Sequence, residues 1–174
     1  YKSAQQVISM LIDVVSKNGN LLLSVPVRAD GTIDDKEIAI LADIKEWMDI
    51  NGQTIYGTRP WKTFGEGPLA EASNPLNAQG FNENNNYSSA DIRFVQRNDT
   101  VFAFTMRYPE EKSCTIKSLG TTSEHCNGKV KSVTMPGYGP VEFIQSAEGL
   151  DIRLPETKVN KLAATFAIGF DKES

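Results

Sequence analysis

The segment Asn20-Leu21-Leu22-Leu23-Ser24-Val25 constrains the fold more than any other part of this sequence. Consecutive apolar side chains in a strand point to both faces of a sheet, which is typical of parallel strands covered by helices on both sides. Such a strand needs neighbours, because the backbone groups along both of its edges must form hydrogen bonds. We therefore expect residues 1–51 to be the end of a larger α/β domain whose earlier strands precede this chain.

Both flanks of this segment carry helix signals. Ser3 and Gln6 form a capping box before an apolar stripe, and this helix is expected to end near residue 18. Asp34 can cap a second helix, with Glu37 three residues later, and the Asn-Gly pair at residues 51–52 stops it. The apolar face expected for the second helix consists of Ile38, Leu41, Ile44, Trp47 and Met48.

The sequence pattern changes after residue 51. Residues 52–89 are rich in glycine, proline and asparagine, and they are interpreted as a linker and surface loop. Short alternating segments then follow over residues 90–174, and they predict an antiparallel β-sandwich. The expected strands cover residues 92–94, 101–108, 114–119, 129–135, 141–145, 150–154 and 163–170. The expected core of this sandwich contains Phe94, Phe102, Phe104, Ile152, Leu154 and Phe166.

Several strings follow one another in a recognisable order. They are Val15-Ser16-Lys17-Asn18-Gly19-Asn20-Leu21-Leu22-Leu23, Ala29-Asp30-Gly31-Thr32-Ile33, the stretch from Asn51 to Trp61, Asp91-Ile92-Arg93-Phe94, and the stretch from Glu148 to Pro155. The ordered set resembles the C-terminal part of family 29 glycoside hydrolases, the α-L-fucosidases. The resemblance implies a mixed fold: the last helix-strand-helix of a (β/α)₈ barrel, with residues 20–25 as the eighth strand, followed by an antiparallel β-sandwich.

The resemblance also implies a function. It suggests a retaining exo-α-L-fucosidase that removes terminal α-L-fucose from glycans without a cofactor, in a secreted, periplasmic or lysosome-like compartment. Its two catalytic carboxylates are expected upstream, so no catalytic residue is assigned within this chain, and the sandwich is expected to be an accessory domain. Two alternatives stay open: a carbohydrate-binding β-sandwich module, or a purely structural or subunit-contact domain.

Three residues of the N-terminal part are candidates for the rim of the active site. Active sites of such barrels lie at the C-terminal ends of the strands, which places Ser24, Arg28 and Asp30 toward the chemistry. Simpler interpretations are that Arg28 faces solvent on a loop and that Asp30 shapes a turn.

Two aromatic residues are candidates for sugar contact or for an interface. Trp61 follows the Arg-Pro pair at residues 59–60, where packing between the barrel and the sandwich would bury it, and Tyr138 lies between two glycines as an exposed ring.

The histidine and the two cysteines, which are common metal ligands, do not form a recognisable metal-binding motif. His125, Cys126 and Cys114 lack zinc-site spacing, so no metal is predicted, and a bridge between the two cysteines is left open.

Charge and hydropathy exclude two classes of partner. Lysine plus arginine total 18 against 22 for aspartate plus glutamate, and no basic stripe is present, so nucleic acid is not an expected partner. The longest apolar stretches, residues 21–27 and 162–170, are too short for a membrane span of about 20 residues.

The expected partners are a fucosylated glycan, the missing barrel and a second copy of the chain.

Overall fold

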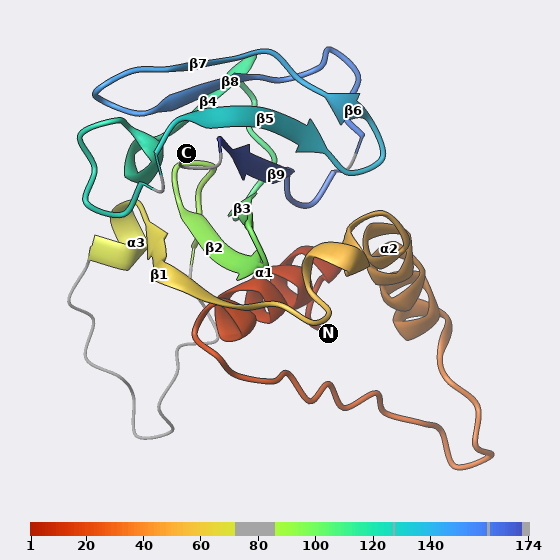
Figure 1. The fold of residues 1–174 in the computed structure, drawn as a ribbon. Helices are drawn as coiled ribbons and strands as arrows, with labels where there is room; N and C mark the ends of the chain where they lie inside the picture. The colour runs from red at the N-terminus through yellow and green to blue at the C-terminus, as the bar shows by residue number, and fades with distance from the viewer. Residues whose placement is uncertain (72–85, 127, 160, 172–174) are drawn as a thin grey trace.

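The computed structural model describes residues 1–71, 86–126, 128–159 and 161–171. Three layers make up the fold (Figure 1). Helices α1 (Ala4–Ser16) and α2 (Asp35–Asn51) lie on one side of a six-stranded sheet, and a three-stranded sheet lies on the other. The larger sheet is therefore covered on both faces, unlike one half of a simple two-layer sandwich.

The strands of both sheets are antiparallel. The six-stranded sheet has the order β1-β2-β3-β9-β5-β6, and the three-stranded sheet has the order β4-β8-β7. Short helical turns accompany them: η1 (Gly52–Thr54), α3 (Pro68–Glu71) and η2 (Lys117–Leu119). The strands are β1 (Arg59–Glu66), β2 (Ile92–Arg97), β3 (Thr100–Thr105), β4 (Ser113–Ile116), β5 (Val130–Met135), β6 (Gly139–Pro140), β7 (Phe143–Gln145), β8 (Leu150–Arg153) and β9 (Thr165–Phe170).

Both helix starts agree with the sequence signals. In the capping box of α1, Ser3 Oγ accepts a hydrogen bond from Gln6 N at 3.2 Å, and Gln6 Oε1 accepts one from Ser3 N at 2.8 Å. Asp34 Oδ1 caps α2 by accepting from the backbone N–H groups of residues 36 and 37, at 2.9 and 3.0 Å. No helix in the described ranges has the length and apolar character needed to cross a bilayer.

Residues 20–25 do not form the buried strand that their pattern predicts. Figure 1 shows this part of the chain as a long connection between α1 and α2. Leu22 is 96% exposed and Leu23 is 38% exposed. The physical reason is that, within the described residues, no strand lies beside the segment to pair with its backbone.

The expected linker contains a strand of the larger sheet. Strand β1 pairs with β2, from Arg59 opposite Gln96 to Glu66 opposite Ile92, with an irregularity between Pro60 and Gly65. The linker interpretation is therefore wrong for this part, because an edge strand tolerates the proline and glycine that suggested a loop. Most of the asparagine-rich stretch, residues 74–86, falls outside the described residues.

Six side chains expected in one core are all buried, but they belong to two cores. Phe94, Ile152, Leu154 and Phe166 lie between the two sheets, as expected. Phe102 and Phe104 point the other way, toward the helices, in a second core that contains Ile8, Ile12 and Trp47. The assignment of these two phenylalanines to the sandwich core is wrong, because Val101 and Ala103 fill that face of β3 instead.

Candidate functional site

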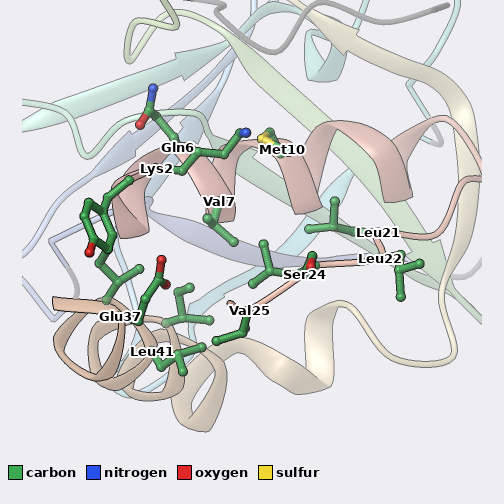
Figure 2. A pocket seen from close by; sticks show the side chains of 14 residues that line it. Lys2, Gln6, Val7, Met10, Leu21, Leu22, Ser24, Val25, Glu37 and Leu41 are labelled. Carbon is green, nitrogen blue, oxygen red and sulfur yellow. The ribbon is translucent and has the colours of Figure 1, made fainter. Parts of the chain in front are cut away.

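A groove of about 600 Å³ lies between α1, α2 and the segment of residues 20–25. Figure 2 shows Val7 of α1, Leu41 of α2, and Leu21 and Val25 of the connecting segment around it. α2 contributes only part of its expected apolar face to the sheet, because Trp47 is buried there while Ile38 is 52% exposed. The N-terminal half of α2 and the segment opposite it therefore leave apolar surface uncovered.

The groove is suited to burying apolar side chains rather than to cleaving a glycosidic bond. Glu37 is the one carboxylate among its lining residues, and it is half-buried. A retaining glycosidase uses two carboxyl groups about 5 to 5.5 Å apart. Among the described residues that line the groove, there is no second carboxylate to form such a pair with Glu37.

Tyr1, which lines the groove, belongs to a small hydrogen-bonded group at the start of α2. Tyr1 Oη donates to Asp34 Oδ2 at 2.8 Å, and Lys36 Nζ lies 5.4 Å from the centre of the Tyr1 ring. The hydrogen bond to Asp34 raises the pKa of the Tyr1 phenol. The backbone N–H of Glu37, followed by the Tyr1 hydroxyl, lowers the pKa of Asp34, which keeps the helix cap ionised.

Of the three candidate rim residues, Ser24 lines the groove and the other two form a separate turn. Thr32 donates to Asp30 Oδ1 from its backbone N at 3.0 Å and from its hydroxyl at 2.7 Å. These bonds lower the pKa of Asp30, and they confirm its interpretation as a turn residue. Arg28 is exposed, and its guanidinium donates to Thr32 Oγ1 at 3.4 Å.

The two candidate aromatics differ in exposure. Trp61 is 5% exposed and packs in the core between the sheets, with its ring 4.9 Å from that of Phe94. Trp61 is thus buried, but by the sandwich core between the two sheets rather than at the expected junction of barrel and sandwich, because β1 directs it there. Tyr138 is 55% exposed in a turn after β5, which confirms it as an exposed ring.

The cysteines and the histidine do not gather into a metal site. Cys114 is buried in β4, Cys126 is half-buried, and both carry free thiols, so the bridge left open by the sequence is not formed. Burial raises the pKa of the Cys114 thiol to about 12. His125 lies beside Trp61, with ring centres 6.3 Å apart. Among the residues that the structure places, no three histidine, cysteine or acidic side chains are arranged to hold a metal ion.

An ionic link between α1 and β2 was not expected from the sequence. Arg93 Nε donates to Asp13 Oδ1 at 2.7 Å, and Lys17 Nζ lies 2.8 Å from Asp13 Oδ2. Gly65 leaves room for this arginine, since a Cβ at that position would lie 2.8 Å from Arg93 Cδ. The available signal was a charged residue in each of two apolar patterns, Asp13 in the helical stripe and Arg93 between Ile92 and Phe94.

Two models of known protein families match this chain. The model of the α-L-fucosidase family matches residues 1–53, and that of the α-L-fucosidase C-terminal domain matches residues 84–170, half of the chain. The chain belongs to the α-L-fucosidase family. Neither match covers residues 54–83, which follow α1 and α2 and include β1 and α3.

Individual α-L-fucosidases align along nearly the whole chain. An α-L-fucosidase of Branchiostoma floridae is 25% identical over 172 residues, which cover 96% of this chain and 32% of that protein. Tissue α-L-fucosidase of Mus musculus is 27% identical over 164 residues, covering 93% and 30%. The crystal structure of Thermotoga maritima α-fucosidase in complex with fucose matches with a TM-score of 0.70 and 25% identity, covering 95% of this chain and 34% of that one. The chain thus spans about a third of the length of the α-L-fucosidases that it matches.

Proposed function

We propose that this chain is the C-terminal part of a retaining exo-α-L-fucosidase that removes terminal α-L-fucose from glycans. The nucleophile and the acid/base carboxylate are assigned to the part of the protein outside this chain. Membership of the α-L-fucosidase family supports this assignment, as does the match to about a third of each relative's length. The fucose in the Thermotoga maritima structure supports a fucosylated substrate.

The unpaired apolar segment of residues 20–25 is the observation that carries the proposal. A strand of this composition gains about 1.5 to 3 kcal/mol for each large side chain that is fully buried, but only when neighbouring strands and helices cover it. Here Leu22 and Leu23 are exposed, and the flanking helices leave a groove along the segment. An additional strand from the preceding barrel would supply backbone partners and cover, and residues 20–25 would become the eighth barrel strand.

In this arrangement the sandwich acts as an accessory domain that supports the barrel. The helical layer shares a core with β2 and β3, so the last barrel helices would be held directly on the larger sheet. A glycan-binding module would instead require a platform of exposed rings, whereas Trp61 is buried and the exposed rings of Tyr56 and Tyr138 lie in turns between elements. Ser24, Arg28 and Asp30 follow or end the proposed eighth strand, and we assign them to the rim of the sugar pocket.

Activity measurements on two forms of the protein test the proposal. The full-length protein should hydrolyse an aryl α-L-fucoside, and proton NMR should show the α-anomer of fucose as the first product, because retaining enzymes preserve configuration. The 174-residue chain alone should release no aryl alcohol above the uncatalysed rate. Turnover by the pure chain that disappears in an Asp30→Asn variant would contradict the assignment of catalysis to the missing part.

A further inference from the structure

The tip of the hairpin between β2 and β3 carries the tripeptide Asn98-Asp99-Thr100. An asparagine followed, after any residue except proline, by serine or threonine is the acceptor pattern for N-linked glycosylation. We propose that Asn98 is an N-glycosylation site, which takes an oligosaccharide from a lipid-linked donor. The proposal rests on the position of these residues in the fold as well as on the sequence pattern.

Asn98 is exposed, and its amide has no structural task within the described residues. The side chain makes no hydrogen bond to another described residue. Its backbone has a φ of 52°, in the left-handed region that asparagine tolerates better than most residues. Asn98 therefore serves the turn through its backbone conformation at positive φ, and its side-chain Nδ2 atom is available for modification.

The surroundings of the tip leave room for a glycan. Arg97 fixes the base of the tip by donating to the carbonyl oxygens of Gln53 and Tyr56, at 2.6 and 3.0 Å. Thr100 closes the hairpin opposite Arg97, and Asp99 is exposed. Asn98 is not among the residues that line the groove between α1 and α2. A glycan at this position would extend into solvent without covering that groove or either core.

A second tripeptide, Asn86-Tyr87-Ser88, has the same pattern in a different setting. Its middle residue is buried and accepts a hydrogen bond from Arg107 Nε at 2.7 Å through its carbonyl oxygen. The hydroxyl of Ser88 donates to Asp91 Oδ2 at 3.0 Å. We restrict the proposal to Asn98, and the second tripeptide serves as an internal reference in the test.

The chemistry is a glycosyl transfer. A bond forms between Asn98 Nδ2 and the anomeric carbon of the first sugar of an oligosaccharide carried on a polyisoprenoid diphosphate. The bond from that carbon to the diphosphate oxygen breaks, and the lipid diphosphate leaves with the electron pair. One amide proton passes to a basic group of the transferase, so the asparagine remains neutral.

The test is a peptide map of the full-length protein secreted by a eukaryotic cell line. Treatment with a peptide amidase that releases N-glycans in heavy-oxygen water should convert Asn98 to a labelled aspartate, and untreated protein should yield the corresponding glycopeptide. Thr100→Val keeps a β-branched residue in β3 and should abolish the glycopeptide, whereas Thr100→Ser should retain it. Asn98→Gly keeps a residue suited to positive φ and should also abolish it.

Bare Asn98 in the secreted wild-type protein would overturn the proposal. That result would count most strongly if residue 86 carried a glycan in the same sample, because the chain would then have met the transferase. Fucoside hydrolysis by the same preparations reports separately on the proposed function, since the Asn98→Gly variant should hydrolyse an aryl α-L-fucoside as fast as the wild-type protein.

Discussion

The guanidinium of Arg93 in β2 lies 2.7 Å from the carboxylate of Asp13 in α1, and this ion pair joins the helical layer to the larger sheet. The Arg93 side chain is 2% exposed, and it also stands 5.4 Å from the ring centres of Phe64 and Tyr87. A guanidinium removed from water in this way requires its counter-ion, because an unpaired buried charge is strongly destabilising.

Removal of Asp13 should therefore be costly. Asp13→Ala leaves Arg93 buried without a counter-ion, and we expect it to lower the free energy of unfolding by about 3 to 5 kcal/mol. Urea denaturation of the wild-type and variant chains measures this. Lys17→Ala is the matched control, because Lys17 contacts the same carboxylate from a half-exposed position and should cost less than about 1 kcal/mol. Equal effects of the two substitutions would contradict the central role of Arg93.

The two faces of the larger sheet should respond separately to large-to-small substitutions. Phe104→Ala and Phe166→Ala should each lower the free energy of unfolding by about 3 to 5 kcal/mol, since both side chains are fully buried. In NMR spectra of the folded variants, Phe104→Ala should shift mainly the resonances of α1 and α2. Phe166→Ala should shift those of β4 and β8. The same set of shifted resonances in both variants would argue against two cores.

A charged substitution at residue 22 should affect the stability of the full-length protein but not that of this chain. Leu22→Lys should leave the unfolding midpoint of the 174-residue chain almost unchanged, because Leu22 is exposed there. In the full-length protein the proposed barrel buries this position, and the same substitution should lower the thermal midpoint or the yield of soluble enzyme. Leu23→Lys gives an independent comparison at the next residue. An unchanged midpoint and yield in the full-length variants would refute the eighth-strand assignment.

The buried thiol of Cys114 predicts a pH dependence of stability. Its pKa is about 12 in the folded chain, against 9.0 for an unperturbed thiol. As pH rises, the Cys114 thiol of the unfolded chain is deprotonated before that of the folded chain. The stabilisation that comes from burying the neutral Cys114 thiol is therefore complete below about pH 9, and it is lost as pH rises toward 12. Urea denaturation of wild type and Cys114→Ala across this range should show a difference that shrinks with pH. A difference that does not change with pH would contradict the shift.

The same burial predicts different reactivity for the two cysteines. At pH 8, iodoacetamide should alkylate Cys126 of the folded chain well before Cys114, because only the thiolate reacts and Cys114 is both buried and protonated. Mass mapping of tryptic peptides at several times measures both rates. In denaturing urea the rates should become similar, which is the control for sequence effects.

Local signals predicted the local parts of this fold. The capping box at Ser3 and the Asp34 cap are contacts within one turn, and the alternation around β8 and β9 reflects burial of one or both strand faces. Strand β1 was missed because Pro60 and Gly65 are typical of turns, and its place at the sheet edge depends on pairing with residues about 30 positions away. The pairing of Asp13 with Arg93 was missed for a similar reason: each charge interrupts an apolar pattern, but the sequence does not say which two distant charges meet.

The candidate site was less predictable than the fold. The pattern of residues 20–25 predicts a buried strand, yet burial depends on partners, and the residues that the structure describes supply no partner strand for that segment. The predicted direction of Phe102 and Phe104 was wrong because both faces of β3 are apolar, and alternation alone does not say which face meets which layer.

Strand β3 is covered on one face by the smaller sheet and on the other by the helices, and this limits where the protein can be truncated. A cut near residue 52, where the first family match ends, would separate α1 and α2 from the sheets, and it would expose Phe102 and Phe104 to water. Such a truncated sandwich is expected to aggregate or to bind hydrophobic dyes, because a large apolar patch on one sheet face favours association. The smallest well-behaved piece of this region therefore includes α1 and α2, and a scanning calorimetry trace of it should show one transition in which helices and sheets melt together.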